Sequence, residues 1–374
     1  MHSDPKNKCL LVVYLPEAQL PRFPDQMARF DFLRENYQIT ALISSGDIGI
    51  EVSRTVRIAS RNPLLFAVKA ALAMRNIAHD YDFIYVIGVP ALMLFSFASP
   101  RRPVIAYAPT HYLQHFGDPA SMGLKKKLVT VIKRQVFFRG LKKVSSLTSI
   151  SRQLEELYRP LARRVLTIPM GVDLGLYAPR VPLDVSPVPL RIVYAGSGGQ
   201  GRGMELIVAC ARRLLEEGCR IEFHLIGCRD VMLEQLLTDE PALRAVIHLL
   251  PGMPYADVIQ AYSRMDVGLS LLESNIFYCA SPPQKIFEYM AAGLPMICNK
   301  IVTHTDYVRG SAVLVEYDAD SLYHGVMEML GRYAMYQSAA IAVATDMEAY
   351  SYHYVEQQFH AEISRQLGTL AVKG

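Results

Sequence analysis

The sequence predicts an α/β protein with two domains, each built around a doubly wound parallel sheet. Its 374 residues exceed what one hydrophobic core usually holds. Apolar runs of strand length alternate with helix-length segments along the chain, which is the pattern of β-α-β units. A proline-rich stretch from Pro169 to Pro189 separates the two series of strands and is expected to contain the linker.

Each half of the chain contains six runs that we expect to form strands. Those of the first half are Cys9–Leu15, Ile39–Ser44, Phe83–Gly88, Val104–Tyr107, Leu147–Ser149 and Val165–Ile168. Those of the second half are Leu190–Ala195, Ile221–Ile226, Val246–Leu249, Val267–Leu272, Pro295–Cys298 and Ala312–Val315. Because these runs are apolar, the strands should be covered on both faces, as in parallel sheets. The chain after Tyr333 is expected to be helical, including Ser351–Leu367.

These elements suggest where the domains begin and end. We expect the first domain over residues 1–170, the linker over 171–189 and the second domain over 190–345. The remaining residues, 346–374, are expected to include a C-terminal helix that packs back on the first domain. Two doubly wound domains facing each other would bring the carboxyl ends of their strands to a common cleft, where such sheets bind ligands.

Composition narrows the class of protein. A net charge of +4 is too small to indicate nucleic acid, and no recognition motif accompanies it. Six cysteines form no C-x-x-C pair, which favours reduced thiols over disulfides or a zinc site. Residues 1–8 are polar and charged, unlike a signal peptide. The apolar run Phe83–Ser99 is interrupted by Gly88 and Pro90, so strand, turn and buried helix fit it better than a membrane span. We therefore expect a cytoplasmic protein.

The segment Ser281–Pro295 carries the most functional information. Ser281 and Gln284 have the spacing of a capping box, Pro282 suits the first helical position, and Gly293 would end the helix. The amides that open a helix attract phosphate, and Lys285 adds a full charge there. Glu288, on the same helix face, could accept hydrogen bonds from the two hydroxyls of a ribose. The alternative is an ordinary buried helix with a surface lysine.

A glycine-rich loop, Gly196–Gly203, joins the strand Leu190–Ala195 to the predicted helix Met204–Glu217. Its glycines allow close approach of the backbone to an anion, and Arg202 offers a two-pronged donor for phosphate oxygens. The loop also satisfies G-x-G-x-x-G, so a dinucleotide-binding domain is an alternative. That alternative requires an acidic residue at the end of the next strand, which instead ends Ile226-Gly227-Cys228-Arg229. A turn with a solvated arginine is the third interpretation.

Three segments together resemble the retaining family 4 glycosyltransferases, which have the GT-B fold of two facing Rossmann-like domains. Ile168–Asp173 with Tyr177–Pro179 resembles the interdomain signature of that family, Gly196–Gly203 its diphosphate loop, and Ser281–Pro295 the half of its E-x7-E motif that contains the second glutamate. The resemblance covers most of residues 145–345 and is weaker over the first hundred. It implies a nucleoside diphosphate sugar as donor, most often UDP-linked, no cofactor, and retention of anomeric configuration.

The resemblance also implies roles for single residues. The catalytic candidates are His111, Arg202 and Lys285; the donor-binding candidates are Gly196, Ser197, Gly198, Gly227, Leu250, Met253, Ser281, Lys285, Ile286 and Glu288. Arg202 would meet the diphosphate, Glu288 the ribose, and the loop Leu250–Met253 the base. His111 would touch the transferred sugar, although a structural loop histidine is an equal alternative.

The sequence also departs from the family pattern. Ala280 stands where the first glutamate of E-x7-E would contact the sugar ring, so sugar recognition must be arranged differently. Asn275, Tyr278 and Ser281 are nearby polar candidates for that contact. Ser197 stands near the place of an arginine that is often found early in the diphosphate loop. The N-terminal glycine-rich loop of the family is replaced by Pro16–Pro21.

No metal site is expected. Asp80-Tyr81-Asp82 and Asp318-Ala319-Asp320 satisfy D-x-D, but both lie at element boundaries, where aspartates commonly cap. Helix amides and basic side chains would instead stabilise the leaving diphosphate. The segment Lys125–Lys143 contains eight Lys or Arg residues and no acid. It is either a solvated basic helix or a peripheral contact with the anionic inner face of a membrane.

The predicted function is transfer of a hexose from a UDP-sugar to a hydroxyl of a glycan or lipid-linked saccharide (EC 2.4 class). Retention without a convincing side-chain nucleophile favours a front-face mechanism, in which a donor phosphate oxygen takes the acceptor proton. A sugar-nucleotide epimerase of the same fold, an NAD-dependent dehydrogenase using Gly196–Gly203, and a catalytically silent nucleotide-sugar sensor are the alternatives.

Overall fold

The computed structural model describes residues 7–14, 24–44, 48–117 and 122–371. The chain divides into two compact units, Met1–Pro169 together with His353–Gly374, and Met170–Tyr352. Pro16–Pro21 lies outside the described residues.

The first unit is built on a seven-stranded parallel sheet with the order β3-β2-β1-β4-β5-β6-β7. Its strands are β1 Lys8–Val13, β2 Gln38–Ile43, β3 Arg54–Arg57, β4 Phe83–Ile87, β5 Val104–Tyr107, β6 Ser146–Ser149 and β7 Val165–Thr167. Its helices are α1 Pro24–Asn36, α2 Pro63–Ile77, α3 Leu113–Phe116, α4 Leu124–Leu141, α5 Arg152–Tyr158 and α13 Tyr352–Ala371, with a buried 3-10 segment, η2 Val89–Ser96. Aromatic rings of α13 pack on this unit, for example Phe359 on Phe32 and Tyr85.

The second unit is built on a six-stranded parallel sheet with the order β10-β9-β8-β11-β12-β13. Its strands are β8 Leu190–Ala195, β9 Ile221–Ile226, β10 Ile247–Leu250, β11 Val267–Ser270, β12 Met296–Asn299 and β13 Ala312–Val315. Its helices are α6 Met204–Glu216, α7 Val231–Asp239, α8 Tyr255–Tyr262, α9 Gln284–Ala291, α10 Val302–Thr305, α11 Ala319–Gly331 and α12 Tyr333–Thr345.

The predicted fold class is confirmed, and all twelve expected strands are present with ends shifted by at most two residues. The sequence did not predict β3, whose residues Arg54–Arg57 are mostly exposed. This strand lies at the edge of its sheet and pairs only with β2 among the described strands. An edge strand is held by backbone hydrogen bonds on one side and can form from polar residues. Its sequence therefore lacks the apolar run from which the other strands were predicted.

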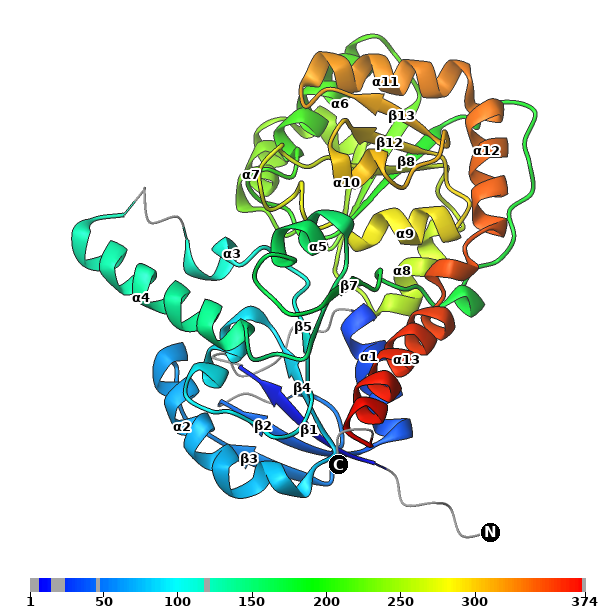
Figure 1. Cartoon of the computed structure of the whole chain (residues 1–374). Helices are drawn as coiled ribbons and strands as arrows, with labels where there is room; N and C mark the ends of the chain where they lie inside the picture. Colours follow the sequence, from blue (N-terminus) through cyan, green and yellow to red (C-terminus); the bar gives the residue numbers. More distant parts are fainter. Residues whose placement is uncertain (1–6, 15–23, 45–47, 118–121, 372–374) are drawn as a thin grey trace. The chain divides into compact units, whose positions relative to one another are not determined.

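Helices cover the two faces of the second sheet (Figure 1). On one face, α6 and α11 contact each other and bury apolar side chains such as Ile192, Phe223 and Ile297 of the strands. On the other face, the Tyr289 ring of α9 lies against Gly268 of β11, where a Cβ would stand only 2.5 Å from the ring. Because Gly268 leaves this space, α9 packs directly on the strand.

Both sheets reverse their strand order at one point, between β1 and β4 in the first unit and between β8 and β11 in the second. Ligands of open α/β sheets bind outside the carboxyl ends of the strands at such a switch point. In the second unit the segments that follow β8 and β11 are the glycine-rich loop and residues 271–283. The candidate site is therefore built at this edge.

Candidate functional site

Helix α9 begins at Gln284, two residues later than the capping-box prediction requires. Pro283 is the N-cap, no side chain caps the helix, and the Gln284 side chain donates instead to the Gly171 carbonyl at 2.8 Å. The predicted Ser281 cap is therefore wrong, because the two prolines keep the chain extended until Gln284. The end of the helix is as predicted. Gly293 has φ +60° and donates to Met290, while Leu294 donates to Tyr289, which is a Schellman motif.

Tyr289 anchors α9 to the central strand of the sheet. Its hydroxyl accepts a hydrogen bond from the Ala195 amide and donates to the Val193 carbonyl, both at 3.1 Å. Lys285 lies one turn earlier on the same face of the helix. This anchor therefore fixes the Lys285 side chain below the end of β8.

Lys285 is a buried cation, with 6% of its surface exposed. Its ammonium lies 3.3 Å from the centre of the Tyr194 ring and has no hydrogen-bond partner among the described residues. A Cβ on Gly196 would stand 3.5 Å from Nζ, so the ammonium lies directly under the glycine-rich loop. Burial and then the charge of Arg202 lower the pKa of Lys285 well below its usual value. An anion at this position would relieve the cost of burying that charge.

Glu288 lies three residues further along α9 and is also buried. Its Oε2 accepts a hydrogen bond of 2.8 Å from the Tyr262 hydroxyl of α8. Burial raises its pKa to about 7, against the lowering effects of Tyr262 and Lys285. The sequence placed Glu288 on a ribose but did not reveal Tyr262, which is 26 residues away in the chain.

Arg202 lies in the glycine-rich loop beside the Tyr278 ring, with its guanidinium carbon 5.7 Å from the ring centre. The loop is tightly packed where it joins α6. Gly203 adopts a left-handed conformation at the start of α6, where a Cβ would stand 2.7 Å from Cβ of Leu271. Lys285 packs on Tyr194 of β8, and burial and then the charge of Arg202 lower the Lys285 pKa. The loop and α9 therefore each contribute a cation near the end of β8.

Asp230 bears on the dinucleotide alternative, because it lies just beyond β9. Its Oδ2 accepts the Gly199 amide at 3.1 Å, and its Oδ1 accepts the amides of Met232 and Leu233 at the start of α7. The carboxylate is therefore engaged by backbone groups as a helix cap, and a ribose would compete with all three.

Glu273 is a candidate that the sequence did not single out. It follows β11, its amide donates to the Gly201 carbonyl at 2.8 Å, and its exposed carboxylate lies beside Gly201. By contrast, Ala280 is buried, and the Asn275 carboxamide oxygen accepts the amides of Phe277 and Tyr278. Asn275 is thus occupied in holding the turn.

A buried polar network supports the chain after β11. His304 joins the Ser270 hydroxyl at 3.1 Å and the Asn299 carbonyl at 2.8 Å. The Asn299 side chain pairs with both the amide and the carbonyl of Leu272. Burial lowers the pKa of His304 to about 4, so the ring is neutral near pH 7. This network positions the residues that lead into Glu273.

The predicted base-binding residues lie at the ends of β9 and β10. Leu250 is the last residue of β10 and not part of the following loop, and its carbonyl accepts the Gly227 amide at 3.0 Å. Gly227 and Gly252 approach closely, since a Cβ on Gly227 would stand 3.7 Å from the Gly252 Cα. Met253 is half-buried. The backbone is thus tightly packed at this point.

The remaining donor-binding candidates of the second unit are spread around Lys285. Ser197 is exposed, and its carbonyl accepts the Tyr194 hydroxyl at 2.9 Å. A Cβ on Gly198 would stand 2.7 Å from the Cys228 sulfur. Ile286 is fully buried, and its amide donates to the Pro283 carbonyl at 3.1 Å, which leaves Gln284 and Lys285 as the amides that open the helix.

Arg180 of the linker is a further residue that sequence reasoning missed. Its guanidinium donates to the carbonyls of Ala292 at 2.7 Å and Met265 at 2.8 Å, and also to that of Tyr262. These carbonyls end or follow α8 and α9. One side chain therefore holds the two helices that carry Tyr262 and Glu288, and its positive charge suits their C-terminal ends.

His111 belongs to the first unit and follows β5. Its Nδ1 accepts the Leu113 amide at 3.1 Å, and its ring lies 4.9 Å from that of Tyr112. Burial and then the charge of Arg134 lower its pKa, so the ring is neutral near pH 7. The Nδ1 contact shows a local structural task, and a contact with a sugar stays a prediction.

The basic segment of the first unit forms α4. Its C-terminal half packs tightly, since a Cβ on Gly140 would meet the Leu92 carbonyl of η2 at 2.2 Å. Its N-terminal half exposes large apolar side chains: Leu124, Leu128, Val129, Val131 and Ile132. No helix in the described ranges combines the length and apolar character needed to cross a bilayer. Of the D-x-D aspartates, Asp318 caps α11 and Asp82 accepts the Lys8 amide.

Residues 189–332, which include β8–β13, α9 and the glycine-rich loop, match the model of the family described as glycosyl transferases group 1. A comparison with curated proteins finds no match.

Solved structures give the fold. Sucrose-phosphate synthase from Thermosynechococcus elongatus is similar over 97% of this chain and 100% of its own, with a TM-score of 0.71 and 15% identity. HepE from Anabaena in complex with UDP-glucose is similar over 96% of this chain and 99% of its own, with a TM-score of 0.67 and 16% identity. WaaG, a glycosyltransferase involved in lipopolysaccharide biosynthesis, is similar over 94% of this chain and 99% of its own, with a TM-score of 0.67 and 11% identity. The chain has the GT-B fold. The resemblance to GT-B glycosyltransferases that the sequence indicated is thereby confirmed.

Proposed function

We propose that this protein is a glycosyltransferase of the retaining family 4 type, which moves a hexose from a nucleoside diphosphate sugar to an acceptor hydroxyl. The observation that carries the proposal is the buried Lys285 ammonium under the glycine-rich loop, with Arg202 nearby. Two cations at a sheet switch point suit a diphosphate. The family match over residues 189–332 supports the same donor class.

Each side chain then has a task in the reaction. Lys285, Arg202 and the first amides of α9 bind the two phosphates and stabilise the charge that grows on them as the glycosidic bond breaks. Glu288 accepts the ribose hydroxyls, with Tyr262 holding its carboxylate in place. The base lies against the chain from Leu250 to Met253. The similar protein HepE has been solved with UDP and with UDP-glucose, which supports UDP as the nucleotide.

Glu273 takes the task of the glutamate that Ala280 replaces. Its carboxylate is exposed beside Gly201, next to the loop that meets the diphosphate. A carboxylate there can accept hydrogen bonds from sugar hydroxyls, whereas the Ala280 methyl cannot. Transfer with retention follows from a front-face route, in which a donor phosphate oxygen takes the acceptor proton and the sugar–phosphate bond breaks on the same face. Neither a metal ion nor a cofactor has a part in this route.

The experiment that tests the proposal pairs binding with product analysis. Thermal-shift measurements with UDP, GDP, ADP, NAD and UDP-sugars should show stabilisation by UDP and a UDP-sugar, because a ligand that binds only the folded state raises its stability. Incubation with that UDP-sugar and a saccharide acceptor should release UDP and form an α-linked product from an α-linked donor, as read by NMR. Stabilisation by NAD alone would favour a dehydrogenase. A changed sugar nucleotide without acceptor would favour an epimerase, and binding without turnover a sensor.

The acceptor side is proposed to be a lipid-linked saccharide at an anionic membrane surface on the cytoplasmic side. The observation that favours it is the N-terminal half of α4, where exposed Leu124 and Leu128 flank exposed Lys125–Lys127 and Ile132 follows one turn later. Lysines bind anionic headgroups while apolar side chains enter the interface. Flotation with vesicles that contain phosphatidylglycerol should carry the protein, and vesicles of phosphatidylcholine alone should not. Combined Lys125→Glu, Lys126→Glu and Lys127→Glu should abolish flotation without affecting UDP binding. Equal flotation of this variant would exclude the surface.

A further inference from the structure

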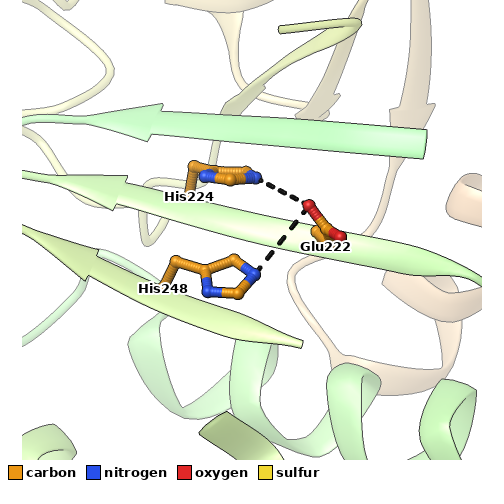
Figure 2. A group of neighbouring side chains, drawn as sticks. All are labelled: Glu222, His224 and His248. Atoms are coloured by element: carbon orange, nitrogen blue, oxygen red, sulfur yellow. Dashed lines mark hydrogen bonds and ion pairs between the residues drawn. The ribbon is translucent and has the colours of Figure 1, made fainter. Parts of the chain in front are cut away.

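Three side chains with metal-binding atoms gather on the sheet of the second unit, at the β9–β10 edge (Figure 2). Glu222 and His224 are two residues apart on β9 and so project from the same face. His248 on β10 pairs directly with His224 in the parallel register. The intervening Phe223 belongs to the hydrophobic core, so the three polar groups lie on the opposite face of the sheet.

Their spacing is close to that of a metal centre. The Nε2 atom of His224 lies 3.2 Å from Oε2 of Glu222, and that of His248 lies 3.9 Å from the same oxygen. The two rings are 4.7 Å apart and inclined by 34°. In a tetrahedral zinc site with bonds of about 2.0–2.2 Å, neighbouring ligand atoms are about 3.3–3.5 Å apart. Shifts below about 1 Å would therefore bring these three atoms onto one ion.

The cluster is accessible from solvent. The side chains are 15% (His224), 28% (Glu222) and 35% (His248) exposed, so an ion and a completing water can enter.

We propose that Glu222, His224 and His248 form a binding site for a divalent transition-metal ion, with zinc the best match. Two imidazoles and one carboxylate suit zinc and its neighbours, whereas magnesium and calcium prefer oxygen alone. The proposed sugar transfer involves no metal, so this site goes beyond it. The ion would cross-link β9 to β10, the edge strand in the order of the sheet.

The position of the cluster suggests what the cross-link stabilises. His248 precedes Leu250 by two residues, and Leu250 accepts the Gly227 amide at the strand ends. An ion held between the strands would keep this pair of strand ends in register. Any consequence of this register for nucleotide affinity rests on the proposed function, whereas metal binding does not and is measured without nucleotide.

The test uses untagged full-length protein and Zn²⁺ alone. Titration calorimetry should show one Zn²⁺ per chain, and Co²⁺ in its place should give the intense visible absorption of a tetrahedral nitrogen and oxygen site. His224→Gln and His248→Gln should each weaken Zn²⁺ binding by at least the 10–100-fold that loss of even an outer-shell partner costs. Zn²⁺ should raise the melting temperature of the wild type and of neither variant.

His79→Gln is the matched control, because His79 also pairs with a carboxylate, Asp80 at 3.1 Å, but is exposed. It should bind Zn²⁺ as the wild type does. Circular dichroism and melting without metal establish that each variant folds, and Glu222→Gln gives a third variant if one does not. Stoichiometric Zn²⁺ binding that survives both histidine substitutions, or no binding by the wild type, would overturn the proposal.

Discussion

Each unit buries one cation against a tyrosine ring, but the surroundings of the two cations differ. In the first unit the guanidinium carbon of Arg29 lies 4.2 Å from the centre of the Tyr107 ring. In the second the Lys285 ammonium lies 3.3 Å from that of Tyr194. Arg29 is 4% and Lys285 6% exposed, so burial alone does not distinguish them.

The difference is the balance of the neighbouring charges. Although burial opposes it, the oxygens of Tyr85 and Tyr107 and the carboxylate of Asp25 raise the pKa of Arg29. Asp25 in turn accepts the Tyr107 hydroxyl at 2.8 Å. Burial and then the second cation, Arg202, lower the pKa of Lys285 well below its usual value, and Glu288 offsets them only in part. Removing a buried cation that the protein compensates leaves its partners buried without it, whereas a poorly compensated cation indicates a site for an anion.

The largest expected effect is on the compensated cation. Arg29→Met should lower the free energy of unfolding by about 3–5 kcal/mol, because it leaves Asp25 buried without its cation. Arg34→Met on the same helix, in an exposed pair with Asp31, should cost less than about 1 kcal/mol. Urea unfolding measures both. UDP affinity of the folded Arg29 variant should match the wild type, and a stability equal to that of the Arg34 variant would contradict the assignment.

The opposite pattern is expected for Lys285→Met. Loss of a charge-assisted contact with phosphate should weaken UDP binding roughly 10–100-fold, since such contacts contribute about 1.5–3 kcal/mol. The ligand-free protein should be as stable as the wild type or more so, because a poorly compensated buried charge is replaced by a side chain of similar length. Calorimetry and thermal melting measure the two effects. Lys300→Met, which removes an exposed lysine paired with Glu316, is the control for both. A Lys285 variant that loses stability but retains UDP affinity would show that this ammonium is structural.

The secondary structure could be predicted from the sequence where an element leaves a local pattern of apolar or capping residues. Strands that are mostly buried form largely apolar runs, so β5, β8, β9 and β13 were predicted residue for residue. The exposed edge strand β3 left no such run. The start of α9 was misplaced by two residues because Pro282 and Pro283 keep the chain extended. The Gln284 side chain, which was expected to complete a capping box, bonds instead to Gly171, a partner 113 residues away that no local pattern shows.

The candidate site could likewise be predicted only where its residues carry a local sequence signal. Lys285 and the glycine-rich loop could be associated because each has a local phosphate signal. Three other features depend on strand register and helix packing: the hydrogen bond from Tyr262 to Glu288, the contact of Arg180 with the end of α9, and the pairing of His224 with His248. Such contacts join residues that are distant in the chain, and they emerge only when the sheet is assembled.

The buried Glu288 should make the stability of the protein depend on pH. Its pKa is about 7 in the folded protein against an ordinary value of 4.5, so the folded state binds more protons than the unfolded state between these values. Stability should therefore fall as the pH rises through this window, by about 3 kcal/mol from this group. Glu288→Gln stays neutral and should remove most of that fall.

Urea unfolding at about pH 5 and about pH 8 measures the change. Glu240→Gln is the control, because a hydrogen bond from Arg212 lowers the pKa of the exposed Glu240 below its ordinary value of 4.5, so this substitution should leave the change between these two pH values unaffected. An equal pH dependence in the wild type and in Glu288→Gln would mean that Glu288 is ionised in the folded protein throughout the window.

The smallest effect is expected at the exposed end of the site, where Glu273 is proposed to contact the sugar but not the nucleotide. Glu273→Gln should leave UDP affinity unchanged and lower kcat/KM for the UDP-sugar roughly tenfold, since a hydrogen bond to a charged acceptor contributes about 1.5–3 kcal/mol. Glu316→Gln in the same unit is the control, because Glu316 pairs with Lys300 on the surface. Steady-state kinetics with calorimetry on UDP separates the two effects. If UDP affinity falls with kcat/KM, Glu273 acts by holding the glycine-rich loop through Gly201, and recognition of the sugar must come from another residue.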